Sequence, residues 1–143
     1  MVPSGMVHAL ELVRYLLKPG ALLIDIHPSG EAPVLEVVND TQRARVGRLE
    51  ETDNFVEYLQ AELSLAKVIE NGWFEFESRQ EFNFNIHASS LVEFQEFLAE
   101  NWKDAIIPEE TASKISALVV DPKDGGIKLI ASELIYITRL SRI

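Results

Sequence analysis

The chain has 143 residues, of which 47% are hydrophobic and 25% charged, and its formal net charge at pH 7 is −10. This length predicts a single domain over residues 1–143, and the composition excludes an intrinsically disordered chain. The acidic excess argues against nucleic acid and anionic membrane surfaces as partners, because their negative charge would be repelled.

The sequence lacks cysteine, a signal-like N-terminus and long apolar runs, and each absence excludes a kind of site or segment. The chain has no cysteine, which excludes disulfides, thiolate zinc sites and a thiol nucleophile. The N-terminus lacks the basic start and apolar core of a secretory signal, and no apolar run is long enough to span a bilayer. A soluble cytoplasmic protein is therefore expected.

The N-terminal part is predicted to form a helix followed by a buried strand. Over residues 5–18, apolar side chains recur at helical spacing, at Met6, Leu10, Val13 and Leu17. Pro19 and Gly20 end this helix, because proline cannot continue it and glycine accepts the turn. Residues 21–26 are apolar apart from Asp25, the pattern of a central strand covered on both faces.

The middle of the chain is predicted to add a hairpin and a long helix. Residues 33–49 hold two β-prone pieces around a polar turn, which favours a small hairpin. The acidic residues 50–53 are interpreted as the charged start of a helix that ends near Gly72, with Thr52 or Asp53 as its cap. Its inward side chains are expected to be Phe55, Leu59, Leu63, Ala66 and Ile69.

The C-terminal part is predicted to alternate strands and helices. Residues 73–87 place mostly apolar side chains at even positions and polar ones at odd positions, which indicates a long strand, or two strands around a bulge near residues 78–80. Ser90 and Glu93 form a capping box that opens a helix. The remaining predicted elements are a helix from Pro108 to about Val119, a turn over residues 121–126, and a last β segment over residues 127–140 with a bulge near Glu133.

This order of elements indicates an α/β protein with at least one crossover helix between parallel strands. Within it, the segment ELVRYLLKPGALLIDI resembles the stretch that leads into the fifth strand of class I S-adenosylmethionine-dependent methyltransferases, written R-x-L-K-P-G-G-x-L. The matching residues are Glu11, Arg14, Leu17, Lys18, Pro19, Gly20 and Leu22, while Ala21 stands where a second glycine is usual.

The resemblance implies a fold for nearly the whole chain, but only the C-terminal half of the family's fold. It implies a partial Rossmann-like methyltransferase sheet, mixed, with about three main strands plus an inserted β-hairpin, flanked by helices. In that family the final strand inserts antiparallel between the fifth and sixth strands. The cofactor lies against the front half of the sheet, on a glycine-rich turn and an acidic residue that holds the ribose. This chain has no G-x-G turn after a strand, so none of its residues is expected to bind S-adenosylmethionine without a partner chain.

The candidate substrate-binding residues are His27, His87 and Asp25. His27 follows the first predicted strand and His87 the second, so parallel strands would bring both to one edge, with backbones roughly 10 Å apart if one strand lies between them. In the resemblance this edge borders the methyl acceptor. The simpler alternative is that each histidine caps a strand end or faces solvent, and that Asp25 is a structural carboxylate, which could orient His27. These residues lack the close spacing of metal motifs, so no metal is expected.

Two hypotheses for the function follow. In the first, the chain is a methyltransferase-like half domain, inactive by itself, that forms part of a split or truncated S-adenosylmethionine-dependent methyltransferase. In the second, it is a non-enzymatic binding or assembly module built on a half methyltransferase sheet. Both leave the strand over residues 21–26 without a neighbour on one side, which predicts either a homodimer or a complex with a separate N-terminal-half chain.

Overall fold

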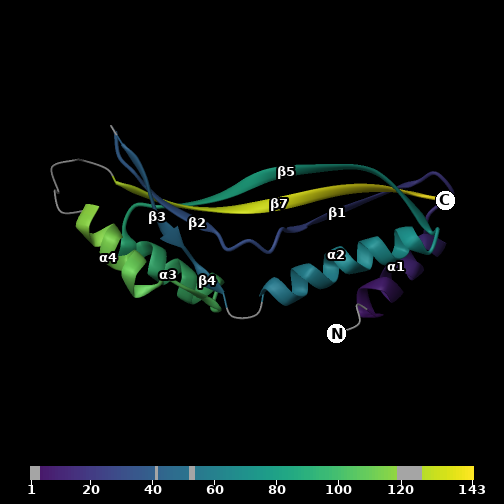
Figure 1. Cartoon of the computed structure of the whole chain (residues 1–143), viewed down its shortest axis with the longest axis horizontal. Coiled ribbons are helices and arrows are strands. Elements are labelled where there is room, and N and C mark those ends of the chain that lie inside the picture. The colour runs from purple at the N-terminus through teal and green to yellow at the C-terminus, as the bar shows by residue number, and fades with distance from the viewer. Residues whose placement is uncertain (1–3, 41, 52–53, 119–126) are drawn as a thin grey trace. The chain divides into compact units, whose positions relative to one another are not determined.

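The computed structural model describes residues 4–40, 42–51, 54–118 and 127–143 (Figure 1). It is an α/β structure in which a sheet is flanked by helices. The elements, in chain order, are α1 (Ser4–Leu16), β1 (Leu22–Pro28), β2 (Val34–Val38), β3 (Arg43–Arg48), β4 (Glu50–Glu51), α2 (Asn54–Glu70), β5 (Phe74–Ala88), α3 (Leu91–Asn101), β6 (Ala105–Ile106), α4 (Glu109–Leu118) and β7 (Lys128–Arg142).

The C-terminal strand β7 is the common partner of the main strands. Within the described residues, the larger sheet has five strands in the order β1-β7-β2-β3, and β5 also pairs with β7. The second half of β7 pairs antiparallel with β1, from Leu22↔Ser141 to Pro28↔Ile135. Its first half pairs antiparallel with β2, from Val34↔Ser132 to Val38↔Lys128. A short second sheet joins β4 to β6.

The chain divides into two compact units. The first consists of Met1–Gly30, Asn54–Phe82 and Leu134–Ile143. Here α1 and α2 lie on the same side of the β1, β5 and β7 ribbons (Figure 1). Its core comprises five buried side chains from two helices and two strands, namely Leu10, Leu65, Val68, Phe74 and Leu140. Burial of each of these large side chains contributes about 1.5–3 kcal/mol, so the helix pair and the strands stabilise one another.

The second unit consists of Glu31–Asp53 and Asn83–Glu133. The β2–β3 hairpin and the first half of β7 pack with α3 and α4 around buried apolar side chains that include Leu35, Val46, Phe94, Leu98, Ile115 and Leu129. The N-terminus of α3 is capped as predicted, because the Ser90 hydroxyl accepts a hydrogen bond from the Glu93 N–H at 3.1 Å. The Glu93 carboxylate in turn accepts from the N–H and hydroxyl of Ser89 rather than from Ser90, which lowers the Glu93 pKa.

The predicted hairpin and the long strand β5 are confirmed, but three other expectations are wrong. The sheet was expected to be mixed, with about three main strands plus an inserted hairpin. The five strands β1, β5, β7, β2 and β3 fit that count, but every pairing with a described register is antiparallel, because β7 lies beside β1 and β2. The strand expected over residues 21–26 extends through Pro28, so His27 lies within it. Glu50 and Glu51 form β4 and do not begin the helix. The turn predicted over residues 121–126 and the cap at Thr52 or Asp53 lie outside the described residues.

The inward face of α2 differs in part from the prediction. Ile69 packs against the core as expected, whereas Leu59 and Leu63 are each 47% exposed, and the buried apolar residues are Leu65 and Val68. This helix carries apolar residues on more than one side, so helical spacing alone did not determine its inward face. Among the described helices, none combines the length and the apolar character needed to cross a membrane.

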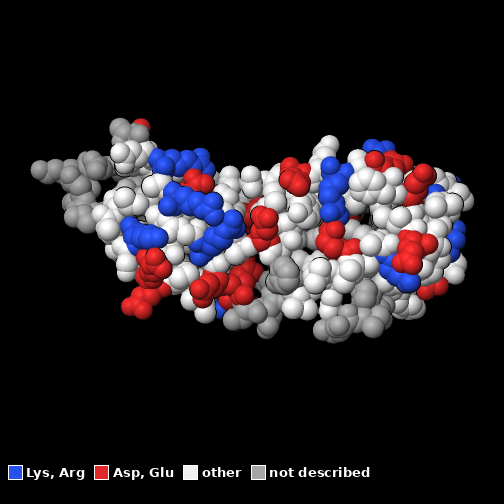
Figure 2. Space-filling view, viewed as in Figure 1, with Lys and Arg blue, Asp and Glu red and all other residues white. Residues whose placement is uncertain are grey.

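The end strands of the sheet differ in charge. β3 carries Arg43, Arg45 and Arg48, all exposed, and Figure 2 shows Lys and Arg side chains gathered in the region where Figure 1 places β3. β5 carries exposed glutamates at positions 75, 77 and 81. Charges of this kind discourage further strand pairing. The exposed side chains of β1 are Leu22, Ile24 and Ile26, which are apolar.

Gly47 in β3 leaves room for α4. A Cβ atom placed on Gly47 would lie 2.4 Å from the Thr111 hydroxyl oxygen and 3.3 Å from the Thr111 Cβ, so rotating the threonine does not relieve the overlap. We expect Gly47→Ala to lower the free energy of unfolding by about 1–3 kcal/mol in urea titrations. Gly5→Ala in α1 meets nothing within 4 Å and should raise it by about 0.5–1 kcal/mol. Equal stability of the two variants would contradict the close approach of β3 to α4.

Candidate functional site

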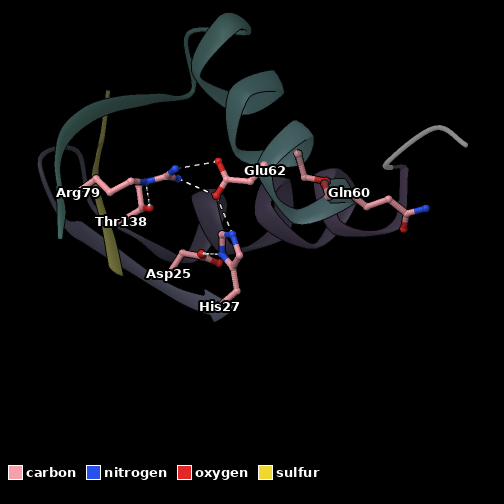
Figure 3. Close-up of polar contacts among 7 residues, drawn as sticks. Asp25, His27, Gln60, Glu62, Arg79 and Thr138 are labelled. Atoms are coloured by element: carbon pink, nitrogen blue, oxygen red, sulfur yellow. Dashed lines mark hydrogen bonds and ion pairs between the residues drawn. The ribbon is translucent and has the colours of Figure 1, made fainter. Parts of the chain in front are cut away.

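A cluster of polar side chains lies between the sheet and α2 in the first unit (Figure 3). Asp25 and His27 come from β1, Glu62 from α2, Arg79 from β5 and Thr138 from β7. Hydrogen bonds or close charge contacts join each to at least one other. Four elements that are distant in sequence therefore meet in one network.

Strand alternation explains how β1 supplies two of these groups. Successive side chains of a strand point to opposite faces, so Leu23, Asp25 and His27 share one face. Leu23 contacts the apolar core of this unit, which places all three on the helix-covered face. The register sets Asp25 opposite Thr138 and His27 opposite Tyr136. The polar residues of β1 thus lie on its covered side.

His27 lies between two carboxylates and is almost completely buried. Its side chain is 9% exposed, its Nδ1 is hydrogen-bonded to the Asp25 carboxylate, and its Nε2 lies 2.7 Å from Glu62 Oε1. The Nε2 geometry does not meet that of an aligned hydrogen bond, so we interpret this second contact mainly as a charge interaction. The ring of Tyr136 approaches edge-on, with ring centroids 6.2 Å apart.

Arg79 completes the network from the other side of Glu62. Its two terminal nitrogens donate to the two oxygens of Glu62 at 2.8 and 2.9 Å, the bidentate arrangement in which arginine binds carboxylates most strongly. Its Nε donates to the Thr138 hydroxyl at 3.0 Å. The guanidinium carbon lies 4.8 Å from the centroid of the Tyr136 ring, a cation–π distance. Arg79 is therefore held in position by three different partners.

The electrostatics of this cluster favour a protonated His27. The hydrogen bond that His27 donates to Asp25 raises the His27 pKa above 6.5, burial opposes this, and the negative charges of Asp25 and Glu62 raise it further. With His27 protonated, the two carboxylates face one imidazolium and one guanidinium, and their formal charges cancel. With His27 neutral, the same groups carry one excess negative charge. The cluster therefore holds the proton of His27 more tightly than an unperturbed histidine would be held.

The chemistry open to this cluster is limited by how fully its members bind one another. Both ring nitrogens of His27 face carboxylates, and Arg79 is occupied by Glu62 and Thr138. Across the described ranges, no three His, Cys, Asp or Glu residues are placed to hold a metal ion. The arrangement can hold and release a proton, but it presents no exposed nucleophile.

The structure brings together two of the three predicted site residues. Asp25 contacts His27, as expected of a carboxylate that orients the ring, and His27 neither caps the strand end nor faces solvent. His87 lies in the part of β5 that belongs to the second unit, is exposed, and is not a member of this cluster. A shared edge of His27 and His87 that borders a substrate stays a prediction.

Sequence reasoning missed Glu62 and Arg79. Glu62 lies three residues after Leu59 and four before Ala66, on the helix face that was expected to point inward, but only the apolar residues of that face were considered. Arg79 looks like an ordinary charge on the polar face of β5. One signal was available, because Arg79 is the only basic residue among the acidic ones at odd positions 75–81.

A second group with altered acidity lies in the other unit. Burial, together with the negative charge of Glu51, raises the pKa of Glu133 to about 7. Glu133 is only partly buried, so water still screens part of this effect. The same unit has a shallow groove of about 350 Å³ whose lining residues are Gln95, Leu98, Ala99, Lys103, Ala105, Ile106 and Ile107. No cluster of polar groups converges there, so the His27 cluster is the better candidate site.

Replacing His27 should cost stability, because the substitution leaves two carboxylates without their shared cation. We expect His27→Ala to lower the free energy of unfolding by about 2–4 kcal/mol at pH 6. His8→Ala is the matched control, since the side chain of His8 is 70% exposed and its loss should change stability by less than about 0.5 kcal/mol. Urea unfolding of both variants provides the measurement. Equal effects would show that the ion contacts of His27 contribute nothing.

The raised pKa of Glu133 predicts that replacing this residue stabilises the protein, whereas replacing His27 destabilises it. A carboxyl with a pKa raised in the folded state opposes folding when ionised, so its penalty develops from about pH 4.5 to pH 7 and then stays constant. Glu133→Gln should therefore stabilise the protein by about 1–2 kcal/mol at pH 8 and hardly at all at pH 4. Glu96→Gln, at an exposed position of α3, should show no such pH dependence. A gain equal at both pH values would contradict the burial of an ionised carboxylate.

Comparison with known proteins gives no family for this chain. No family model matches it, no curated protein matches it, and no solved structure matches it. Any assignment of function has to start from the residues, the topology and the contacts described above.

Proposed function

We propose that the chain is a methyltransferase-like half domain, inactive by itself, that serves as the acceptor-side part of a split S-adenosylmethionine-dependent methyltransferase. The proposal includes a Rossmann-like sheet that a front-half chain completes. It also includes substrate-side roles for Asp25, His27 and His87. The sequence support is the ELVRYLLKPGALLIDI segment, which resembles the stretch leading into the fifth strand of class I methyltransferases.

The single observation that carries the proposal is the position of β7. β7 pairs with both β1 and β5, and it runs antiparallel to β1. Its contacts with β5 also run in opposite directions along the chain, since Glu77 contacts Arg139 whereas Asn85 contacts Ser132. In the family that the sequence resembles, the last strand likewise inserts antiparallel between the fifth and sixth strands. β1, β5 and β7 would take these three places.

The edge of β1 that faces away from β7 supports the proposal that a neighbouring strand is missing. The N–H of Ser29 bonds to Leu134 and the carbonyl of Ala21 bonds to Arg142, so alternation directs the backbone groups of residues 23, 25 and 27 toward β7. The backbone groups of Leu22, Ile24 and Ile26 then point away from β7. Their side chains are 44–61% exposed, and none is charged. This edge can accept a strand, whereas β3 and β5 carry charges that discourage one.

Pro28 limits where that strand can pair. Pro28 lies on the same outward alternation as Leu22, Ile24 and Ile26, but proline has no N–H to donate. The usable edge is therefore the apolar part of β1 that precedes it. A fourth strand of the methyltransferase sheet, supplied by a front-half chain, fits this short apolar edge.

A non-enzymatic assembly module is the second candidate, and the His27 cluster favours it. Its described groups bind one another, so none of them is visibly free to act on a methyl acceptor. In this alternative the edge of β1 still binds a partner, but the complex does not bind S-adenosylmethionine. The two candidates therefore make different predictions about cofactor binding, and both predict that a partner binds at the edge of β1.

Cofactor binding by the assembled complex tests the choice. We expect calorimetry to detect no S-adenosylmethionine binding by the chain alone, because it has no glycine-rich turn after a strand. Co-expression with a polypeptide from the neighbouring reading frame that carries a strand–G-x-G–helix segment should give a one-to-one complex with micromolar cofactor affinity. A complex without cofactor binding would favour the assembly module, and saturable binding by the isolated chain would refute the proposal.

Without a front-half chain, the same edge should pair with a second copy. Antiparallel pairing of two β1 strands about Ile24 sets Leu22 opposite Ile26, so only apolar side chains meet on the exposed face of β1. We expect a homodimer at micromolar concentration in sedimentation equilibrium. Ile24→Lys should give a monomer, whereas Val92→Lys, at an exposed position of α3, should remain dimeric. A monomeric wild-type chain over this range would rule the dimer out.

A further inference from the structure

We propose that Asp25, His27, Glu62 and Arg79 form a proton-controlled latch that holds the N-terminal half of α2 on the sheet of the first unit. Loss of the proton from His27 weakens the hold on that half of the helix, because Arg79 is then the remaining cation paired with Glu62. This device is independent of the proposed function, since it concerns only how α2 is held within one unit.

The latch depends on where α2 is anchored. The buried apolar side chains of α2 that the structure describes, Leu65 and Val68, both lie in its C-terminal half. Further toward the N-terminus, Val56 and Leu59 are 49% and 47% exposed. Glu62 lies between these two regions and contacts His27 of β1 and Arg79 of β5. An ionic contact therefore holds the helix next to the point where its fully buried apolar side chains end.

The charge balance explains why a single proton controls this anchor. The groups that face His27 are Asp25 on its own strand, Glu62 from α2, Tyr136 edge-on from β7, and Arg79, which lies beyond Glu62 on β5. When His27 is protonated, two cations balance two carboxylates. When His27 is neutral, Arg79 is the remaining cation of the cluster, and of the two carboxylates its described hydrogen bonds reach Glu62 and not Asp25. Glu62 then loses one of its two cations.

The direction of the pH effect follows from the raised pKa of His27, whose largest cause is the hydrogen bond to Asp25. A histidine with a raised pKa in the closed state stabilises that state fully below pH 6.5, and this stabilisation is lost as the pH rises through the closed-state pKa. The latch is therefore closed at mildly acidic pH and opens as the pH rises through the closed-state pKa of His27. Opening would expose the helix-covered face of β1, which carries Asp25 and His27.

Hydrogen exchange and histidine titration together test the latch on the full chain. Ring resonances of His27 give its closed-state pKa by NMR. Exchange protection of amides 56–62, corrected for the intrinsic pH dependence of exchange, should then fall about tenfold for each pH unit by which that pKa exceeds the ordinary value. The fall should occur between pH 6.5 and the measured pKa, while amides of α3 keep constant protection.

Two variants separate the latch from general destabilisation. His27→Gln keeps hydrogen-bonding capacity but removes the titration, so protection of amides 56–62 should be low and independent of pH. His8→Gln removes an exposed histidine of α1 and should keep the wild-type pH dependence. Retention of the pH dependence in His27→Gln would overturn the proposal. An equal loss of protection in α2 and α3 would also overturn it, because that result indicates global unfolding.

Discussion

Strand pairing along β7 is the interaction on which both units depend. One half of this strand pairs with β1 and the other with β2, and β5 pairs with it as well. Its buried residues contribute to both cores, Leu140 to the first and Leu129 to the second. Without β7, β1 would have no described strand partner, and β2 would lose one of its two partners. Buried backbone N–H and C=O groups without hydrogen-bond partners are costly. The candidate site depends on it too, since Thr138 fixes Arg79 and Tyr136 lies against His27.

The charged cluster of the first unit surrounds one buried cation, because the His27 side chain is 9% exposed whereas those of Glu62 and Arg79 are each 30% exposed. Moving His27 out of water is costly, and an apolar cluster of similar volume could be as stable. An apolar cluster would not, however, fix which residue of α2 faces the sheet. Because α2 has apolar residues on more than one side, the contacts of Glu62 with His27 and Arg79 select one rotation of the helix. The same contacts make the rotation sensitive to the charge of His27.

Local elements were predictable from the sequence, whereas the tertiary choices were not. The capping box at Ser90, the hairpin and the alternation of β5 follow from neighbouring residues, and the structure contains all three. Asp25 stood out because a carboxylate interrupts an apolar strand, and this correctly indicated a contact with His27. Glu62 could not be found in this way, since its role depends on how α2 is rotated. The antiparallel pairing depends on contacts between β7 and strands early in the chain, which local patterns do not encode.

The long separation of β1 and β7 has a consequence for synthesis on the ribosome. Leu22 pairs with Ser141, so β1 cannot form its backbone hydrogen bonds with β7 until nearly all the residues between the two strands have been made. Closing so long a loop is entropically costly and slow, and this favours late formation of the first unit. The β2–β3 hairpin needs only neighbouring residues and can form early. During that interval the apolar side chains of β1 lack their sheet, and a nascent chain would need protection against aggregation at that segment.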